Sequence, residues 1–309
     1  MKRIAITGAK GFLGKYCTEY LKDRHKITAL YRSDNKGQFG TVDQVDYLET
    51  DYSVQNLAHH FAGCDCVLHL AARKVAAGEP SGLHHYLDNL SVLENVIQAA
   101  QKAGITNIVT ISSRCVYGTH TPYKFAETDP LTPINFYGVE KVMEEQLCTY
   151  YNHTFSQKIK ILRLSQVVSD SLEDTNAFSV FIRQALSGQD ITLFGTGCAV
   201  RDYIYVKDAC HGIQSALLAE NVSGIYNLAS GFGASMAEIA GRIIELSHSD
   251  SKIIHLENKK EDFTRIILDA GKICRDFNFR TQYSMETMIL DIIAGQNKMN
   301  QGKEGSPNE

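Results

Sequence analysis

Hydrophobic and polar positions alternate along the first half of the chain in two rhythms. Short, nearly continuous apolar runs are separated by longer stretches in which apolar positions recur every three to four residues. The runs predict strands over Arg3–Thr7, Lys26–Tyr31, Asp46–Glu49, Asp65–Ala71, Asn107–Ser112 and Lys158–Leu164. The longer stretches predict helices over Leu13–Lys22, Val54–Phe61, Tyr86–Ala103 and Tyr137–Tyr151. Strands this hydrophobic are covered on both faces, so the pattern indicates an α/β fold with a doubly wound parallel sheet.

The rhythm changes after about Leu164, where the predicted elements become shorter. Helices are predicted over Phe178–Leu186, Met236–Leu246 and Met285–Ala294, and strands over Ile191–Phe194, Asp202–Val206, Ile225–Leu228 and Lys252–Leu256. We therefore expect a large domain over residues 1–165 that also receives about 201–220, and a smaller, discontinuous α/β lobe over 166–296. The polar tail over residues 297–309 is expected to be disordered.

Composition narrows the class of protein. The 309 residues exceed the usual size of one compact core, which favours a large domain with a second lobe. Hydrophobic residues at 44% and charged residues at 21% are ordinary globular values, and the net charge of −4 gives no electrostatic reason to expect nucleic acid or a membrane as partner. The N-terminus lacks a secretory apolar segment, and the eight cysteines have neither a disulfide framework nor zinc-site spacing. We expect a cytoplasmic protein without a metal.

Three glycines, Gly8, Gly11 and Gly14, lie between the first predicted strand and the first predicted helix. In this context a glycine turn lets the backbone approach a pyrophosphate, and the helix N-terminus supplies amide donors and a favourable dipole. The alternative is a tight strand-to-helix turn that binds nothing. The spacing Gly-x-x-Gly-x-x-Gly resembles that of the short-chain dehydrogenase/reductase superfamily, which implies a Rossmann-type sheet with a nicotinamide dinucleotide on this loop.

Arg32 follows the second predicted strand, where an acidic residue would bond the ribose 2′-hydroxyl of NAD. A guanidinium can instead pair with the 2′-phosphate of NADP, so NADP is preferred over NAD, which would also fit; the alternative is an exposed surface arginine. The resemblance implies that Asp51 bonds the adenine and that the segment His69–Ala72 lines the cofactor. The expected cofactor residues are Gly8, Lys10, Gly11, Phe12, Leu13, Arg32, Asp51, Tyr52, Leu70, Ala71, Ala72, Lys74, Asn89, Tyr137 and Lys141.

Tyr137 and Lys141 lie one helical turn apart on one face of a predicted helix. The ammonium favours the phenolate and is expected to lower the pKa of Tyr137 toward neutrality. The tyrosine can then exchange a proton with a carbinol or carbonyl oxygen while a hydride moves. Such a pair is common on amphipathic helices, but here it follows Ser113 at the end of a predicted strand. The resemblance implies that Ser113 hydrogen-bonds the reacting oxygen.

Further motifs resemble the extended branch of the superfamily, the NAD(P)-dependent epimerase/dehydratase family that acts on nucleotide sugars. They are Val116-Tyr117-Gly118, Glu127–Pro133 ahead of the catalytic tyrosine, Phe194–Gly197 and Arg201–Asp208. The resemblance implies a smaller C-terminal lobe that binds the substrate, and it implies that Arg201 grips the nucleotide diphosphate. A planar guanidinium suits that task, and the alternative is an internal salt bridge from Arg201 to Asp202 or Asp208.

The same resemblance implies a substrate set and an assembly. The expected substrate contacts are Ser113, Gln166, Leu193 and Arg201. Members of the family commonly pair through two long helices, which correspond here to the predicted helices over Tyr86–Ala103 and Tyr137–Tyr151. A nucleotide-diphosphate sugar and a second copy of the chain are therefore the expected partners.

The chain departs from the family at informative positions. Arg114 and Cys115 stand where 4,6-dehydratases have acidic residues, so dehydration is not expected. A cysteine matching Cys115 is an acid/base in the GDP-fucose synthase branch, but the histidine that branch also needs has no match here, and a buried, inert cysteine is the alternative. Gln166 replaces an asparagine, and Lys260-Glu261-Asp262 stands for an Arg-Pro-Gly-Asp segment, which leaves the identity of the sugar open.

The leading hypothesis is an NADP(H)-dependent nucleotide-sugar oxidoreductase, with reduction of a 4-keto sugar ahead of 4-epimerisation. An epimerase keeps its cofactor through a turnover, whereas a reductase must exchange it, and a 2′-phosphate site suits exchange. A reductase of a non-nucleotide ketone and a regulator that senses NADP without turnover are the alternatives. Ser113, Tyr137 and Lys141 together argue against a regulator, since a sensor needs no proton relay.

Overall fold

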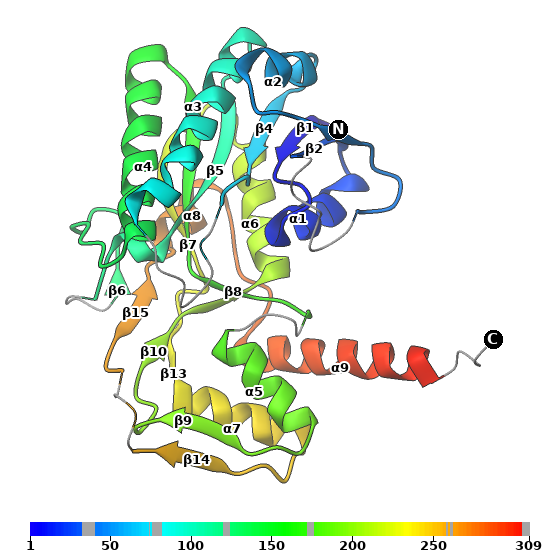
Figure 1. Cartoon of the computed structure of the whole chain (residues 1–309), viewed down its shortest axis with the longest axis vertical. Helices are drawn as coiled ribbons and strands as arrows, with labels where there is room; N and C mark the ends of the chain where they lie inside the picture. The colour runs from blue at the N-terminus through cyan, green and yellow to red at the C-terminus, as the bar shows by residue number, and fades with distance from the viewer. Residues whose placement is uncertain are drawn as a thin grey trace.

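A seven-stranded parallel sheet forms the centre of the larger part of the molecule (Figure 1). The computed structural model describes residues 1–32, 41–73, 75, 82–119, 124–171, 176–257, 259 and 262–304, with side chains as far as 296. The strand order is β12-β7-β5-β4-β1-β2-β3. The strands are β1 (Arg3–Thr7), β2 (Lys26–Tyr31), β3 (Tyr47–Glu49), β4 (Cys66–His69), β5 (Asn107–Ser113), β7 (Lys158–Leu164) and β12 (Gly224–Leu228). The predicted doubly wound parallel sheet is confirmed.

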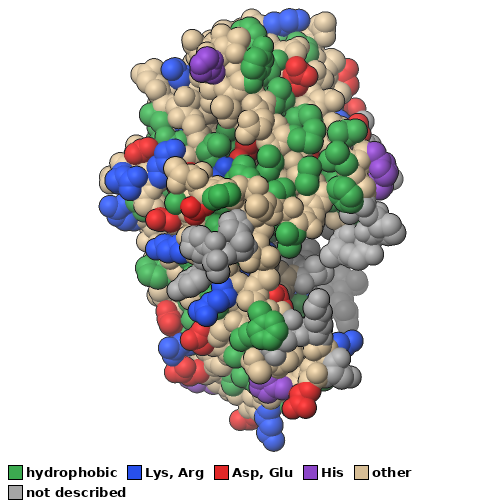
Figure 2. Space-filling view, turned by 90° about the vertical axis from the view of Figure 1, so that its left-hand side faces the viewer, with side chains coloured by type: hydrophobic (Ala, Val, Ile, Leu, Met, Phe, Trp, Pro, Cys, Tyr) green, Lys and Arg blue, Asp and Glu red, His purple; other side chains and the backbone are tan. Residues whose placement is uncertain are grey.

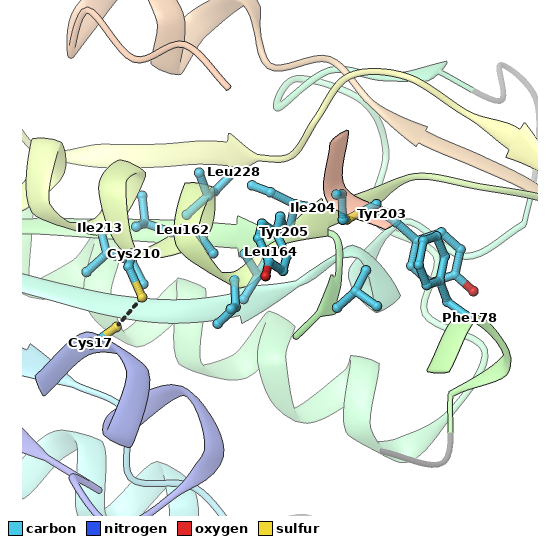
Figure 3. Packing of buried hydrophobic residues seen from close by; sticks show 14 of the residues in the cluster. Cys17, Leu162, Leu164, Phe178, Tyr203, Ile204, Tyr205, Cys210, Ile213 and Leu228 are labelled. Atoms are coloured by element: carbon cyan, nitrogen blue, oxygen red, sulfur yellow. Dashed lines mark hydrogen bonds between the residues drawn. The ribbon is translucent and has the colours of Figure 1, made fainter. Parts of the chain in front are cut away.

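Helices cover both faces of this sheet because successive strand residues point to opposite sides. Ile4 and Ile6 of β1 belong to the core under α1 (Phe12–Lys22) and α6 (Val206–Leu218). Ala5, between them, belongs to the core under α2 (Val54–Phe61), α3 (Leu87–Lys102) and α4 (Phe136–Phe155). Figure 3 shows the first core, in which the sulfur of Cys17 on α1 lies 3.6 Å from that of Cys210 on α6.

The register of the strands brings their carboxyl ends to one edge. Thr7 is paired with His69 between β1 and β4, and Ser113 is paired with Leu164 between β5 and β7. Leu164 is in turn paired with Leu228 of β12. In an open parallel sheet, ligands bind in the crevice outside this edge. The carboxyl ends of strands β1, β4 and β5 therefore mark the expected position of a site.

The smaller part of the molecule contains three short sheets (Figure 1). One has the order β13-β10-β15-β6, and the others pair β11 with β8 and β14 with β9. Their strands are β6 (Lys124–Phe125), β8 (Gln166–Val168), β9 (Ile191–Phe194), β10 (Val200–Arg201), β11 (Tyr203–Tyr205), β13 (Ala234–Ser235), β14 (Ile253–Leu256) and β15 (Arg265–Leu268). The remaining helices are η1 (Leu83–His85), η2 (Arg114–Val116), α5 (Ala177–Leu186), α7 (Met236–Ser247), α8 (Gly271–Asp276) and α9 (Met285–Glu304).

Several stretches differ from the sequence-based prediction, and three of them bear on the division into domains. Ile225–Leu228, expected among the pieces of the smaller lobe, lies in β12 at the edge of the large sheet. The helix α6 was not predicted, although its stretch was expected to return to the large domain. The helix α9 continues from a start anchored by buried Met288, Ile289 and Ile292 as far as Glu304, into the tail that was predicted to be disordered from residue 297 onward. Among the described residues, no helix has both the length and the apolar character needed to cross a membrane.

Candidate active site

The glycine loop after β1 is shaped by close backbone contacts. Gly8 has φ of +71°, and a Cβ on it would lie 2.6 Å from the backbone nitrogen of Ala71. A Cβ on Gly14 would lie 2.2 Å from the carbonyl oxygen of Gly8. These positions therefore accept only glycine, since any side chain would force the loop away from the segment after β4. Gly11 is the N-cap of α1 and no side chain caps this helix, so the first amides of α1 are available to a ligand.

A cavity of about 450 Å³ opens at this loop, a volume in the range of small-molecule sites. It brings together many of the expected cofactor residues, namely Gly8, Lys10, Gly11, Arg32, Tyr52, Leu70, Ala71, Ala72 and Asn89. The sequence analysis missed four other lining residues, Tyr31, Arg73, Asp88 and Val92. Tyr31 and Arg73 directly adjoin predicted ones, so the ends of strands β2 and β4 were the signal that could have identified them.

Some expected cofactor residues lie elsewhere. Phe12 and Leu13 are half-buried against the core under α1. Asp51 does not line the cavity; its carboxylate is exposed and accepts a hydrogen bond from the Ser53 amide at 2.8 Å, which lowers the pKa of Asp51. Tyr52 takes the place beside the loop, and its hydroxyl accepts a hydrogen bond from the amide of Gly8 at 3.2 Å. Lys74 lies outside the described residues.

Two cationic side chains line the cavity without an acidic partner in the described parts of the chain. The Nζ of Lys10 lies 3.3 Å from the ring centroid of Tyr31, and the guanidinium carbon of Arg32 lies 5.1 Å from that of Tyr52. Aromatic faces orient a cation without neutralising it. Both charges are therefore held at the cavity wall in a form that can meet phosphate oxygens.

Asn89 of α3 lines the cavity and stabilises part of its wall. Its Oδ1 accepts a hydrogen bond from the Arg73 amide at 2.7 Å, and its Nδ2 donates to the Arg73 carbonyl at 2.9 Å. The side chain is buried. Asn89 thus ties α3 to the segment that follows β4, which is a structural role in addition to its place in the cavity lining.

The start of α4 carries Tyr137 and lies directly against the end of β5. A Cβ on Gly138 would lie 2.5 Å from the carbonyl oxygen of Cys115, so the absence of a side chain lets η2 pack on α4. The hydroxyl of Ser113 accepts a hydrogen bond from the Cys115 amide at 3.2 Å. The Nζ of Lys141 is 5.7 Å from the centroid of the Tyr137 ring. This packing brings all four candidate catalytic residues into one region.

The pKa of Tyr137 differs in direction from the sequence-based expectation. Burial raises it above its ordinary value, and the charge of Lys141 lowers it only in part. Cys115, Glu140 and Glu144 raise it further. The expected lowering toward neutrality is therefore wrong for this chain on its own, because burial and nearby carboxyl groups outweigh the ammonium.

Two carboxyl groups beside Lys141 were missed by the sequence analysis. The ammonium is 2.7 Å from Oε2 of Glu144 and 3.5 Å from Oε1 of Glu140, and all three side chains are buried. Burial disfavours the ammonium, but Glu144, Tyr137 and Glu140 outweigh it, and the pKa of Lys141 stands above its ordinary value. The spacing was a usable signal, because positions three and seven after Tyr137 share its helix face.

A buried ion pair lies beneath these residues. Arg163 of β7 and Glu145 of α4, 2% and 0% exposed, are joined by two hydrogen bonds of 2.9 and 2.7 Å. The same guanidinium donates to the hydroxyl of Tyr117 at 2.8 Å, and Ser112 donates to the carboxylate at 2.5 Å. The network therefore ties α4 to strands β5 and β7.

Arg201, the residue expected to bind the diphosphate, has protein partners at both terminal nitrogens of its guanidinium. Its Nη1 donates to the carbonyls of Val200 and Thr264 at 2.9 Å each, and its Nη2 pairs with Asp262. The alternative salt bridge to Asp202 or Asp208 is wrong, because both carboxylates accept backbone amides elsewhere. The side chain remains 15% exposed.

The other expected substrate residues differ in their surroundings. Gln166 is half-buried on β8, where its backbone N–H donates to the backbone carbonyl of Asp202 at 3.2 Å. Leu193 is 2% exposed and packs in the hydrophobic core, so its side chain is not available to a substrate. Cys115 is half-buried beside Tyr137. Within the described residues, His, Cys, Asp and Glu form no group of three that could hold a metal.

Comparison with known proteins agrees with this geometry. Residues 4–229 match the family described as "NAD dependent epimerase/dehydratase family". The chain is 31% identical to UDP-N-acetyl-alpha-D-glucosaminuronate decarboxylase of Bacillus cytotoxicus, over 94% of this chain and 97% of that protein. It is 26% identical to an uncharacterized UDP-glucose epimerase of Bacillus subtilis, over 97% and 100%. The crystal structure of UDP-N-acetylglucosamine 4-epimerase from Bacillus cereus superposes with a TM-score of 0.84 and 26% identity, over 95% and 99%.

Proposed function

Because the chain belongs to the NAD dependent epimerase/dehydratase family, we propose that it transfers a hydride at C4 of a nucleotide sugar with Tyr137 as the acid/base. One observation carries this proposal. The sheet edge that holds the glycine-loop cavity also holds Ser113, and it lies against the start of α4 with Tyr137 and Lys141. Ser113, Tyr137 and Lys141 do not line the cavity itself, but a candidate cofactor site and a candidate proton-transfer group at the same edge of the sheet support hydride chemistry.

The residues at the loop fit a nicotinamide dinucleotide. A side chain on Gly8 or Gly14 would collide with backbone, and the uncapped start of α1 leaves amides for a pyrophosphate. Lys10 and Arg32 add positive charge to the same cavity. A nicotinamide dinucleotide held by these residues would supply the acceptor and donor for the hydride.

The protein's own residues would manage the proton at the C4 oxygen. Tyr137 takes the hydroxyl proton as the carbon is oxidised and gives it back on reduction, which is general acid–base catalysis. Ser113 hydrogen-bonds the same oxygen, and the charge of Lys141 stabilises the phenolate. Arg201, whose side chain is 15% exposed, would bind the diphosphate.

Two finer activities receive different support. Two of the proteins compared above are named as epimerases. A 4-epimerase needs only the oxidation at C4 and its reversal, without a second reaction. Reduction of a 4-keto sugar is favoured by one observation, the position of Arg32 in the cavity without an acidic partner among the described residues, which suits an exchangeable NADP. We give 4-epimerisation precedence, because proteins named as epimerases match this chain over nearly its full length, whereas the reductase rests on one side chain.

Turnover assays can separate the two activities. We expect that incubation with NAD⁺ and UDP-glucose or UDP-N-acetylglucosamine inverts C4, seen by chromatography of the sugar, without accumulation of reduced nicotinamide. An epimerase returns the hydride within the turnover, so the absorbance of reduced cofactor stays constant. Stoichiometric oxidation of NADPH by a 4-keto sugar nucleotide, with no inversion, would instead establish the reductase. Failure of every nucleotide sugar tested in both assays would overturn the proposed function.

The preference between NADP and NAD depends on Arg32. If its guanidinium pairs with a 2′-phosphate, Arg32→Ala is expected to weaken NADP binding by about tenfold or more, as for a lost charge-assisted hydrogen bond. NAD binding, which lacks this phosphate, should change by less than about threefold on the same grounds. Fluorescence titration of both cofactors measures the two constants. The exposed Lys15 on α1 provides a control as Lys15→Ala, and an equal loss for both cofactors in Arg32→Ala would contradict the pairing.

The homodimer is proposed through α3 and α4. Large apolar side chains stand exposed on or beside these helices, among them Leu87, Phe136, Tyr150 and Phe155 at 45%, 46%, 56% and 49% exposure. Figure 2 looks onto the side of the molecule where α4 lies and shows hydrophobic side chains gathered on its upper half. Exposed apolar area of this kind is typical of protein interfaces.

A further inference from the structure

The helix face that carries Tyr137 and Lys141 also buries two carboxyl groups. Glu140, Lys141 and Glu144 are only 2%, 4% and 6% exposed at their side chains. The partner of Glu144 is clear, because its Oε2 accepts a hydrogen bond from the Lys141 ammonium at 2.7 Å. Neither carboxyl oxygen of Glu140 has a hydrogen bond within the described part of the chain, and its nearest ionic contact is the 3.5 Å approach to Lys141.

A charge count shows why the two carboxyl groups cannot be equivalent. One ammonium can neutralise one carboxylate, and a second buried carboxylate would be left without compensation at a cost that proteins avoid by protonation. Glu144 has the short contact and the better geometry. Glu140 has the longer contact and unsatisfied oxygens, so it is the group that takes up a proton.

We propose that Glu144 is a positioning residue whose carboxylate holds the Lys141 ammonium, while Glu140 is a neutral carboxylic acid. Together they set the pH range in which Tyr137 acts. This inference rests on the proposed function for the role of Tyr137, but the charge states of the two glutamates do not.

The surroundings of Glu140 support this division. Burial first, and then the neighbouring Glu144, raise the pKa of Glu140 to about 8 although Lys141 and Asn89 of α3 lower it. His69 of β4 faces this region from the sheet. Burial lowers the pKa of His69 to about 4, with opposing effects from Glu144, which raises it, and Lys141, which lowers it, so the imidazole is neutral. Tyr137 and Cys148 on the same helix and Cys115 of η2 are further titratable groups of this region, and burial first, then Glu144 and Glu145, raise the pKa of Cys148. In η1, His85 is engaged by the amide of Gly82 at 2.9 Å.

The negative charge of Glu144 has a consequence for the proton transfer. It offsets the ammonium that would otherwise stabilise the phenolate, and it raises the pKa of Tyr137. Replacing Glu144 by glutamine removes that charge and keeps the size of the side chain. The phenol should then ionise at lower pH.

The matched variants Glu144→Gln and Glu140→Gln test the division. For Glu144→Gln, the acid limb of the pH profile of kcat should move to lower pH by about one unit, as for loss of one charge several ångströms away. Glu140→Gln should keep the wild-type acid limb and differ only above about pH 8, because it replaces a group that is already neutral. Glu144→Asp, which restores the charge, should restore the acid limb. An unmoved acid limb in Glu144→Gln would overturn the role of Glu144.

An absorbance titration reads the same shift without turnover. The tyrosinate absorbance of Tyr137 is obtained as the difference between each protein and its Tyr137→Phe version. In the Glu144→Gln background this difference should appear at lower pH than in wild type. If the two titrations coincide, Glu144 does not control the phenol, whatever reaction the enzyme catalyses.

Thermal unfolding tests the proton on Glu140, again without turnover. A carboxyl whose pKa is raised by folding binds its proton more tightly in the folded chain, so its contribution to stability is present at low pH and is lost as pH rises toward 8. Glu140→Gln lacks this loss, so its Tm relative to wild type should increase by roughly 5 °C between pH 5 and pH 9. The exposed Glu49, changed to glutamine, should show a difference that is constant with pH.

Parallel Tm curves for wild type and Glu140→Gln would overturn the proton on Glu140. If no nucleotide sugar is turned over but the Tm difference grows with pH as expected, the proposed function fails and the assignment of Glu140 stands. If turnover is found but the Tm curves are parallel, the proposed function stands and the assignment of the proton to Glu140 fails. The activity-independent measurements therefore separate the two conclusions.

Discussion

Replacing Tyr137 by phenylalanine is expected to lower kcat for hydride transfer at C4 by about three orders of magnitude, the usual scale of a lost general acid/base. The ring would remain in place beside Tyr86, whose centroid is 6.1 Å away, and only the proton-transferring hydroxyl is removed. Dinucleotide affinity should therefore change by less than about threefold, the scale of one lost neutral hydrogen bond. Single-turnover measurement of cofactor reduction, together with a cofactor titration, separates chemistry from binding.

Two further variants make this result specific. Tyr86→Phe makes the same chemical change in the neighbouring ring and should leave kcat within a few-fold of wild type. Cys115→Ala tests the other candidate acid/base, which is half-buried beside Tyr137. A Tyr137→Phe enzyme that keeps more than a tenth of its activity, together with an inactive Cys115→Ala enzyme, would transfer the proton-transfer role to the cysteine. Unchanged cofactor-dependent behaviour in both variants would favour the sensing regulator.

Replacing Glu145 by leucine is expected to lower the free energy of unfolding by about 3–5 kcal/mol, the cost of leaving a buried charge unpaired. Arg163 would keep its guanidinium in a site that is 2% exposed while losing both hydrogen bonds to the carboxylate. Ser112 would lose its acceptor as well. Denaturant unfolding followed by circular dichroism gives the free energy difference.

The double variant Glu145→Leu with Arg163→Met distinguishes loss of the pair from loss of packing. Removing both charges leaves neither one unpaired, so much of the stability should return. The exposed pair of Arg242 and Glu245 is the matched surface control, and Glu245→Leu should cost less than about 1 kcal/mol. A cost this small for Glu145→Leu would show that Arg163 finds another partner or water. Because Ser112 precedes Ser113, the single variant should also reduce activity under conditions in which it remains folded.

Much of the fold could be predicted from the sequence because its signals are local. Continuous apolar runs located β1, β2, β5 and β7 to within a residue, since each is buried on both faces whatever its neighbours are. The glycine spacing located the cavity, since the close approach between Gly8 and Ala71 is a backbone requirement that only glycine meets. Strands of two residues, such as β10 and β13, carry no periodic signal and were missed.

Charge and position in the sheet were decided by tertiary structure. The sequence places Tyr137 and Lys141 on one helix face, but the direction of the tyrosine pKa follows from burial and from how closely Glu144 approaches the ammonium. Arg201 pairs with Asp262, a residue 61 positions away, rather than with the aspartates beside it in the chain. Likewise, Ile225–Leu228 reads as a short strand, and only its pairing with β7 assigns it to the large sheet.

Secondary structure and ionisation differ in predictability because the first depends on nearby residues in the chain and the second on residues brought together from distant parts of it. Strand and helix patterns and glycine requirements depend on the residue and its chain neighbours. This sequence by itself therefore specifies the doubly wound sheet, the glycine turn after β1 and the positions of Ser113, Tyr137 and Lys141 in the elements. A proton's affinity depends on solvent exclusion and on charges brought together from different elements. The sequence thus determined which groups this protein has for its chemistry, and the packing of α4 against η2 and the sheet decided their ionisation.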